Sequence, residues 1–427
     1  MDTIFASSGG QPPAAIGIVR VSGPQARAAL QALSGRVPAP RQASLAALHD
    51  PVNGEQIDRA LLLWFPGPRT ATGEDLAEFH CHGGRAVIAA ILSALERLPG
   101  LRLAQPGEFT RRAFENGRMD LNAAEGLADL LMAETESQRR AALAMAEGGF
   151  SRQVALWEAQ LLRLSALTEA ALDFSDEDDV PGEGIEAQIV AQIRSLRESV
   201  ASESGRPHAE RLRDGIRVVL AGPPNVGKST LLNALAERDA AIVSPIAGTT
   251  RDRIEVPVAI GGTAFLLTDT AGLRAETTDV IEAIGIDRAA EAIAAADILL
   301  WLGKPDEAPE GAVRIAPRMD DPGFDGAGAD LCLSAVSGEG MNSLRHLLIK
   351  MAATLLPGEG DYALHARQRE AVGAMIAALD ETLNHADDML IVAEGLRAAR
   401  GAIDALTGRS GTEAMLDALF GNFCIGK

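Results

Sequence analysis

One segment of the chain has the residue types and spacing of a phosphate-binding loop. Residues 222–230 read Gly-Pro-Pro-Asn-Val-Gly-Lys-Ser-Thr. In such a loop glycines let backbone N–H groups turn toward a β-phosphate, lysine reaches the β and γ oxygens, and a serine hydroxyl binds Mg²⁺. A glycine-rich turn alone would be a weak signal, but the following Lys-Ser makes a nucleoside triphosphate site the expected function of this segment. Its predicted nucleotide-binding residues are Asn225, Val226, Gly227, Lys228, Ser229 and Thr230.

The flanking sequence predicts the strand and helix that must position this loop. Residues 216–221 are short, apolar and β-branched, and glycines bound them. From Ser229 through Leu235 the apolar residues recur at helical spacing. The loop is therefore expected at the N-terminus of a helix, where the positive end of the helix dipole favours phosphate.

Two further segments follow in the order typical of a GTPase. A polar loop at residues 244–252 leads into a predicted strand at 254–260, and Gly261-Gly262 predicts a tight hairpin turn into a strand at 264–267. That strand ends in Asp-Thr-Ala-Gly, in which Asp269 is expected to hold Mg²⁺ through water. The Thr250 hydroxyl is the expected second Mg²⁺ ligand beside Ser229. The nucleotide-binding residues predicted here are Ser244, Thr249, Thr250, Asp269, Thr270, Ala271 and Gly272.

The base-recognition segment departs from the Asn-Lys-x-Asp pattern of most GTPases, whose aspartate accepts N–H groups of guanine. After a predicted strand at 313–316 the chain reads Pro-Arg-Met-Asp, which keeps a cation and the aspartate, Asp320. Asp306 is the alternative, but it follows the preceding strand, so Asp320 is favoured. The segment between the two strands is too short for a full helix, which predicts modest nucleotide affinity. The loop expected to contact the guanine oxygen consists of Ser334, Ala335 and Val336.

Composition limits the broad class of the protein. With 427 residues and 47% hydrophobic residues, the chain is expected to form several domains with separate cores. The formal charge of −20 excludes a protein that coats nucleic acid non-specifically, so an RNA partner must meet a local basic surface. Three scattered cysteines indicate free thiols in a reducing compartment. No secretion signal or membrane-spanning run is recognisable, so we expect a cytoplasmic protein without a membrane partner.

The pattern of predicted elements divides the chain into four segments. Residues 1–117 alternate short strands and helices and predict an α+β domain. Residues 118–213 and 358–427 are dominated by helical periodicity, and the α/β nucleotide domain lies between them at 214–357. Because an inserted domain returns the chain close to where it left, the two helical segments are expected to form one all-α domain interrupted by the nucleotide domain.

Motifs along the whole chain resemble those of the MnmE (also called TrmE) family of tRNA-modification GTPases. The resemblance rests on Gly-Thr-Thr-Arg-Asp at 248–252 and Asp-Thr-Ala-Gly-Leu-Arg at 269–274, and on segments outside the nucleotide domain. These are residues 16–24, 73–75, 82–84 and 106–110 and the terminal Phe-Cys-Ile-Gly-Lys at 423–427, which is the most specific. The resemblance implies a folate-binding N-terminal domain that dimerises, a split helical domain and an inserted Ras-like GTPase domain.

The same resemblance implies how hydrolysis proceeds. Leu273 occupies the position after Asp-Thr-Ala-Gly, so the glutamine that orients water in Ras-like enzymes is missing. Members of the family use K⁺ in place of an arginine finger, and Glu282 matches the glutamate that positions water, although an exposed helical carboxylate is the alternative reading. The K⁺ ligands implied are Asn225, Ser244, Ile246 and Thr249. The catalytic residues predicted are Glu282, Lys228, Asn225 and Cys424.

A second site is implied for the N-terminal domain, which in this family binds a one-carbon tetrahydrofolate, either the 5-formyl or the 5,10-methylene form, at a dimer interface. The matching residues are Arg20, Glu78, Arg118 and Lys427, although each could instead be a surface ion pair. Cys424 lies close to the chain end and is expected to take part in modification rather than to pack as a small apolar residue. His80-Cys81-His82 invites a metal interpretation, which we disfavour because the residues alternate along a probable strand and lack a fourth ligand at suitable spacing.

The function implied by the resemblance is GTP hydrolysis coupled to formation of a 5-carboxymethylaminomethyl group on the wobble uridine of certain tRNAs. The implied partners are a second copy of the chain, the flavoprotein MnmG and tRNA, and the implied cofactors are GTP, Mg²⁺, K⁺ and the folate. The alternative is a ribosome-assembly GTPase without modification chemistry, against which the folate-type domain and Cys424 argue. A folate enzyme with a degenerate GTPase domain is disfavoured by the intact phosphate loop.

Overall fold

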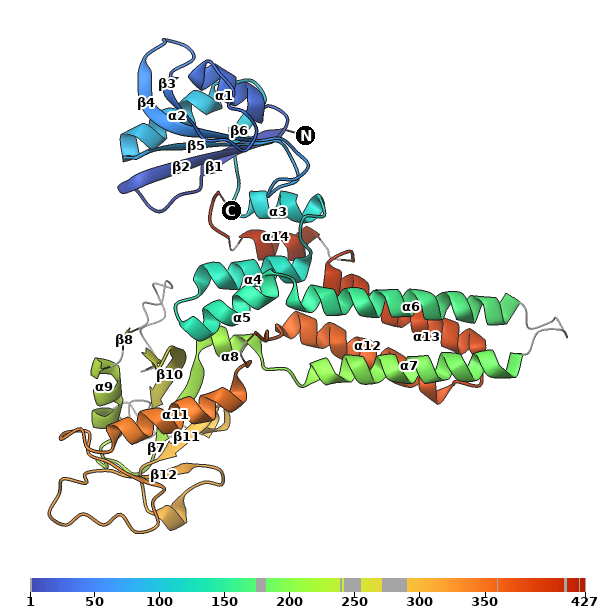
Figure 1. The fold of residues 1–427 in the computed structure, drawn as a ribbon. Helices are drawn as coiled ribbons and strands as arrows, with labels where there is room; N and C mark the ends of the chain where they lie inside the picture. Colours follow the sequence, from blue (N-terminus) through green and yellow to red (C-terminus); the bar gives the residue numbers. More distant parts are fainter. Residues whose placement is uncertain are drawn as a thin grey trace, which may run out of the picture. The chain divides into compact units, whose positions relative to one another are not determined.

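The computed structural model describes residues 2–173, 182–238, 240–241, 255–270, 290–358, 360–410, 413–421 and 423–426. The chain forms two compact units, one of Met1–Ala128 with Thr407–Lys427 and one of Asp129–Leu406. Figure 1 traces the chain through both of them. The two ends of the chain therefore belong to the same unit.

The first unit contains a six-stranded sheet in the order β3-β4-β5-β2-β1-β6. Its strands are β1 (Thr3–Ser7), β2 (Ala14–Ser22), β3 (Ser44–His49), β4 (Gln56–Phe65), β5 (Leu76–Gly83) and β6 (Leu101–Leu103). Buried residues such as Val19, Val21 and Phe79 alternate with less buried ones, as a sheet covered on one face requires. Helices α1 (Ala26–Ser34) and α2 (Arg85–Glu96) cover that face, which confirms the α+β class predicted for the N-terminal domain.

A small helical layer completes this unit. It comprises α3 (Glu108–Glu115), α4 (Leu121–Met132) and the C-terminal α14 (Glu413–Gly421). Leu121 and Ala124 of α4 form one apolar cluster with Leu416, Phe420 and Phe423 near the chain end. The C-terminal helix thus packs against α4, and the sequence pattern assigned both helices to the helical domain.

The second unit contains a bundle of long helices with a continuous apolar core. Its helices are α5 (Glu136–Ala146), α6 (Gly149–Asp173), α7 (Gly182–Ser204), α12 (Ala366–Asn384) and α13 (Met389–Thr407). Core residues recur at helical spacing, as in Val154, Trp157, Leu161 and Leu164 of α6. These helices come from both sides of the nucleotide domain, so the predicted all-α domain with an inserted α/β domain is confirmed (Figure 1).

The chain enters and leaves the nucleotide domain at adjacent backbone segments. The N–H of Ala209 donates to the carbonyl of Leu364 (3.0 Å), and the N–H of Leu364 donates to the carbonyl of Pro207 (3.0 Å). The short helix α8 (Ala209–Asp214) follows and leads into the first strand of the inserted sheet. This pairing is the geometry expected of an inserted domain.

The inserted domain is a seven-stranded sheet in the order β13-β12-β11-β7-β10-β9-β8 with helices α9 (Lys228–Arg238) and α11 (Met341–Leu355) packed into its core. Its strands are β7 (Ile216–Ala221), β8 (Ala240–Ala241), β9 (Glu255–Ile260), β10 (Thr263–Asp269), β11 (Ile298–Trp301), β12 (Val313–Ala316) and β13 (Leu331–Cys332). Gly261 and Gly262 form the predicted tight turn between β9 and β10, both with positive φ. Only a 3₁₀ turn, η1 (Pro305–Glu307), separates β11 from β12 in the described chain, as the short connection predicted.

Candidate functional site

The phosphate loop connects β7 to α9 in the strand–loop–helix order predicted from the sequence. Gly222 has φ 143°, and a Cβ at this position would lie 2.6 Å from the carbonyl oxygen of Leu302. Gly227 has φ 108°, and Asn225 is also left-handed, with φ 59°. The two glycines are therefore required by the backbone, and the loop curls tightly around the space in front of α9.

Lys228 lies under this loop. Its side chain is almost fully buried, and its Nζ donates to the carbonyl oxygens of Gly222 (2.8 Å) and Pro223 (2.7 Å). Phosphate oxygens can take the place of these carbonyls as acceptors, because an ammonium group binds anionic oxygens more strongly than neutral ones.

Ser229 and Asp269 meet although they are far apart in the sequence. The parallel pairing of β10 with β7 sets Asp269 opposite Leu220, directly beside the loop. The Ser229 hydroxyl donates to the Asp269 carboxylate, which is buried. Thr270 is fixed to the same strand end, since its N–H and its hydroxyl both donate to the Leu220 carbonyl (3.2 and 3.0 Å). A hydroxyl beside a carboxylate at a helix N-terminus is an oxygen-donor pair suited to Mg²⁺ with phosphate.

The segment expected to read the base lies against the phosphate loop. The guanidinium of Arg318 donates to the carbonyl oxygen of Asn225 (2.6 Å), and the N–H of Met319 donates to the Leu333 carbonyl (3.0 Å) at the end of β13. Asp320 follows in the same segment and is exposed. The alternative, Asp306, lies in the separate turn η1 and is exposed.

The loop at 334–336 is held next to this segment. Ser334 is fully buried, and its hydroxyl accepts the N–H groups of Val336 (3.2 Å) and Ser337 (3.0 Å). A hollow of about 410 Å³ adjoins the phosphate loop, and its lining includes Val226, Arg318 and Phe324. Its acidic lining residues are Asp321 and Asp325, which follow Asp320 in the chain. Its position and its mixed apolar and polar lining suit a nucleobase.

Several predicted site residues cannot be placed. Those that lie outside the described residues are Ser244, Ile246, Thr249, Thr250, Ala271, Gly272, Glu282 and Lys427.

Two of the predicted folate residues meet on the sheet of the first unit. Arg20 on β2 pairs with Glu78 on β5, with a guanidinium-to-carboxylate distance of 2.9 Å. The other Glu78 oxygen accepts from Nε2 of His80 (2.9 Å). Burial alone would raise the pKa of Glu78, but the hydrogen bond from His80 and the charge of Arg20 outweigh it and hold the pKa below 4.5. Glu78 is therefore an anion at neutral pH, and His80 is a partner that the sequence pattern missed.

The third, Arg118, follows α3 and donates from Nε to the carbonyl oxygen of Thr70 (3.2 Å). The C-terminal residues dock on the same unit. Ser8 donates its hydroxyl to the Gly426 carbonyl (2.9 Å), and Pro106 and Ile425 form an isolated antiparallel bridge. Cys424 lies in this docked tail and is exposed.

The His80-Cys81-His82 segment does not converge on one point. Cys81 is buried in the core beneath the sheet, whereas His80 binds Glu78 and His82 binds Asp58 (2.7 Å). The side chains of a strand alternate between its two faces, so the central thiol and the imidazoles point in opposite directions.

Two family models match the chain. The first, described as "GTP-binding protein TrmE N-terminus", covers residues 3–118, and the second, "MnmE helical domain", covers residues 121–424. Among the described residues no helix is long and apolar enough to cross a membrane.

Curated proteins named "tRNA modification GTPase MnmE" match over the full chain. The protein of Rhizorhabdus wittichii is 61% identical over 428 residues, covering 100% of this chain and 97% of its own. That of Novosphingobium aromaticivorans is 55% identical over 437 residues, covering 100% of both chains. That of Zymomonas mobilis is 50% identical over 440 residues with the same coverage. Identity at this level over the full length, together with both family models, shows that the chain belongs to the MnmE family of tRNA-modification GTPases.

Proposed function

We propose that this GTPase hydrolyses GTP with Mg²⁺ and K⁺ and, together with the flavoprotein MnmG, forms the 5-carboxymethylaminomethyl group on the wobble uridine of certain tRNAs. The observation that carries the nucleotide part is the meeting of Ser229 with Asp269 beside the curled phosphate loop. The pairing of β10 with β7 brings the Asp269 carboxylate to the Ser229 hydroxyl at the start of α9, which supports a shared role of the two oxygens at the phosphates.

Each described group has a role in this proposal. Lys228 exchanges its two loop carbonyls for β- and γ-phosphate oxygens, and Ser229 binds Mg²⁺. Asp269 would help to hold Mg²⁺ through water. Asp320 reads guanine, aided by the loop at 334–336. Mg²⁺ would neutralise charge at the phosphates.

The cation proposal rests on Asn225. It lies in the phosphate loop with a left-handed backbone, and its side chain is exposed and so accessible to a cation. We assign it to K⁺ together with Ser244, Ile246 and Thr249, and we assign Glu282 to the attacking water. K⁺ there would supply the positive charge that an arginine finger supplies in other GTPases.

The route from the nucleotide to the helical bundle passes through the β9–β10 turn. The N–H and the hydroxyl of Ser137, at the start of α5, both donate to the Gly262 carbonyl (3.2 and 3.1 Å). The strand β10 runs from this turn directly to Asp269. We infer that a shift of Asp269 during hydrolysis would be transmitted through this turn to α5 and would drive movement of the helical domain.

We assign the one-carbon tetrahydrofolate to the first unit, with Arg20, Glu78, Arg118 and Lys427 as its ligands. The anionic Glu78 can accept N–H groups of a pterin, and the arginines can bind the carboxylates of a glutamate tail. The docked C-terminal tail brings Cys424 into the same unit, which supports its role in modification. A ribosome-assembly switch would need neither feature.

We propose a homodimer formed through the open face of the sheet in the first unit. On that face Ile16, Leu45 and Leu61 are 60%, 56% and 38% exposed, although all three are large and apolar. Leu45 pairs with Leu61, and Leu61 pairs with His80, so these side chains adjoin the Glu78 site. A clustered apolar face of this kind is typical of a subunit interface.

We assign the protein to the cytoplasm, because its three free cysteines suit a reducing compartment.

Two measurements test the proposed function. Mass spectrometry of tRNA nucleosides from a deletion strain should show loss of the modified wobble uridine, restored by the wild-type gene and not by a Lys228→Ala variant. GTP turnover by the purified protein should fall at least about tenfold when K⁺ is replaced by Na⁺, equivalent to roughly 1.4 kcal/mol of transition-state free energy. Unchanged nucleosides in the deletion strain would overturn the modification role. Equal rates in the two salts would overturn the K⁺ mechanism alone.

A further inference from the structure

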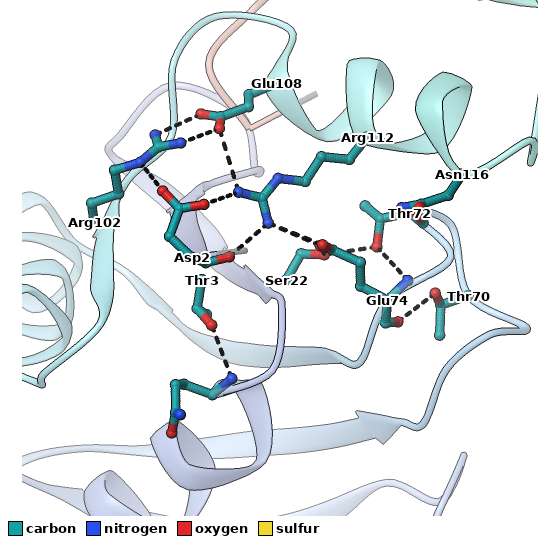
Figure 2. Close-up of polar contacts among 11 residues, drawn as sticks. Asp2, Thr3, Ser22, Thr70, Thr72, Glu74, Arg102, Glu108, Arg112 and Asn116 are labelled. Atoms are coloured by element: carbon teal, nitrogen blue, oxygen red, sulfur yellow. Dashed lines mark hydrogen bonds and ion pairs between the residues drawn. The ribbon is translucent and has the colours of Figure 1, made fainter.

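Arg112 of α3 is a buried cation with an unusually full set of anionic partners (Figure 2). Its side chain is only 10% exposed. One guanidinium nitrogen donates to both oxygens of Glu74 (3.2 and 3.0 Å) and to the Asp2 carbonyl (3.0 Å), and the other donates to the Asp2 carboxylate (2.7 Å). Glu108 lies 3.5 Å away and is itself bound by Arg102. A buried guanidinium of this kind is held in a single orientation.

Glu74 connects Arg112 to the strand that carries Arg20. One of its carboxylate oxygens also accepts the hydroxyl of Ser22 (2.8 Å), which follows Arg20 on β2, and Ser22 in turn bonds to the buried Thr72 (2.7 Å). The Glu74 carbonyl accepts the hydroxyl of Thr70 (2.6 Å). The carboxylate therefore fixes the loop at residues 70–74 against the end of β2.

The opposite side of the same loop orients Arg118. Asn116 donates its side-chain amide to the Thr72 carbonyl (2.7 Å), and Arg118 donates to the Thr70 carbonyl (3.2 Å). A Cβ on Gly73 would lie 2.8 Å from the Cβ of Asn116, so the loop and the end of α3 are in direct contact. The loop thus connects the end of β2, two residues from Arg20, with Arg118, and both arginines are proposed folate ligands.

We propose that Arg112 and Glu74 are positioning residues of the folate site: they fix the loop at 70–74 so that Arg20 and Arg118 are presented in one relative geometry. Burying several charges is an expensive way to hold a loop, since packed apolar residues hold loops equally well. An ion pair with a forked donor fixes direction as well as distance, which is what the support of a binding site requires. The inference rests on the proposed folate function of this unit.

The test measures binding of 5-formyltetrahydrofolate to the full-length protein by calorimetry. Arg112→Lys keeps the positive charge but loses the two-nitrogen guanidinium donor. Glu74→Gln keeps the shape of the side chain but loses its negative charge. Each should weaken binding at least about tenfold, as removal of outer partners does around bound metal ions. GTP turnover, which depends on the other unit, should stay within about twofold of wild type. The double variant should bind folate hardly more weakly than either single variant, because both substitutions disrupt the same Arg112–Glu74 ion pair.

Arg111→Lys is the matched control. Arg111 neighbours Arg112 on α3 and has three acidic partners, Glu115, Glu413 and Asp417, but it does not contact the loop at 70–74. We expect the Arg111→Lys variant to bind the folate with the affinity of wild type, even if its melting temperature falls. If Arg112→Lys does not fold, the milder Glu74→Gln carries the same comparison.

The outcomes separate this inference from the function on which it rests. If wild-type protein does not bind the folate, the folate site fails and the positioning role fails with it. If Arg20→Ala abolishes binding while Arg112→Lys and Glu74→Gln bind like wild type, the folate site stands and the positioning role is overturned. An equal loss in Arg111→Lys would also overturn it, because general destabilisation of α3 would then explain the effect.

Discussion

Single side chains of the nucleotide site are positioned by strand ends that the sequence separates widely. Asp269 reaches Ser229 because β10 pairs in parallel with β7, and Arg318 reaches Asn225 because β12 ends at the same edge of the sheet. The carboxyl ends of parallel strands are where α/β domains assemble their sites. The unusual Pro-Arg-Met-Asp segment therefore lies beside the phosphate loop, which supports the proposal that it reads the base despite its altered sequence.

The proposed guanine-reading role of Asp320 can be tested by replacing its carboxylate, which only accepts hydrogen bonds, with an amide, which also donates them. Asp320→Asn should weaken GTP binding by about 1.5–3 kcal/mol, the range for a hydrogen bond to a charged group, and should favour xanthosine triphosphate. Competition binding with the two nucleotides measures the change, and Asp306→Asn is the control. Unchanged GTP affinity in Asp320→Asn would transfer the role to Asp306 or to backbone groups.

The lowered pKa of Glu108 predicts how the stability of the first unit changes in acid. Burial alone would raise the pKa of Glu108, but hydrogen bonds from Arg102 and from the Gln105 N–H lower it below 4.5. A carboxyl whose pKa is lower in the folded than in the unfolded state stabilises the fold above its unfolded pKa, and this contribution is lost as pH falls through the folded pKa. Thermal melts of wild type should therefore fall more steeply below pH 4.5 than those of Glu108→Gln. Parallel pH profiles would show that the ion pairs of Glu108 contribute nothing to stability.

At the scale of elements, local patterns predicted most strands and helices, because periodicity and turn residues are local properties. The strand at 216–221, the hairpin at 261–262 and the long helices on both sides of the insertion occur as predicted. The contact between α14 and α4 was not predictable in detail, since it depends on Phe420 and Phe423 meeting residues about 300 positions away in the chain. For the same reason the sequence identified Arg20 and Glu78 only by resemblance and missed His80 and Arg112.

The two ends of α3 offer a matched test of how the tail docks. Gly107 has φ 68°, and a Cβ there would lie 2.1 Å from the Phe420 carbonyl oxygen, whereas Gly117 has φ 64° with open space around it. Gly117→Ala should cost only the backbone strain of a left-handed residue, about 1–2 kcal/mol. Gly107→Ala should cost more and displace the end of α14.

Hydrogen exchange of α14 and thiol labelling of Cys424 measure this difference. Both should increase in Gly107→Ala and remain near wild type in Gly117→Ala. Equal effects of the two substitutions would mean that the contact between Gly107 and Phe420 does not hold the tail in place.

At the scale of the whole molecule, charge is divided unequally between the two units. Residues 1–128 with 407–427 contain as many basic as acidic residues, so the acidic excess lies entirely within 129–406. A polyanion such as tRNA is repelled less by the first unit than by the second. This division agrees with a molecule whose modification chemistry and phosphate chemistry lie in different units.

The proposed dimer is tested by placing a charge on the open sheet face. Leu61→Asp should convert the dimer to a monomer, because an unpaired carboxylate would be buried in an apolar interface at a cost of roughly 2 kcal/mol or more. Light scattering coupled to size exclusion measures the mass. Val52→Asp is the control, since Val52 is 74% exposed in a turn outside that face. A dimer that survives Leu61→Asp would place the interface elsewhere.

Removal of residues 424–427 tests whether hydrolysis and modification are separable. The tail docks on the first unit through Gly426 and Ile425, whereas Lys228, Ser229 and Asp269 all belong to the second. GTP turnover should therefore survive nearly intact while the modified wobble uridine disappears from tRNA, as nucleoside mass spectrometry would show.

The Cys424→Ser variant should reproduce most of that loss if the thiol takes part in the chemistry. The Ser8→Ala variant should weaken docking of the tail by only about 1 kcal/mol. Full modification by Cys424→Ser would assign the cysteine to packing, and a truncation that also stopped GTP turnover would mean that the tail supports the dimer.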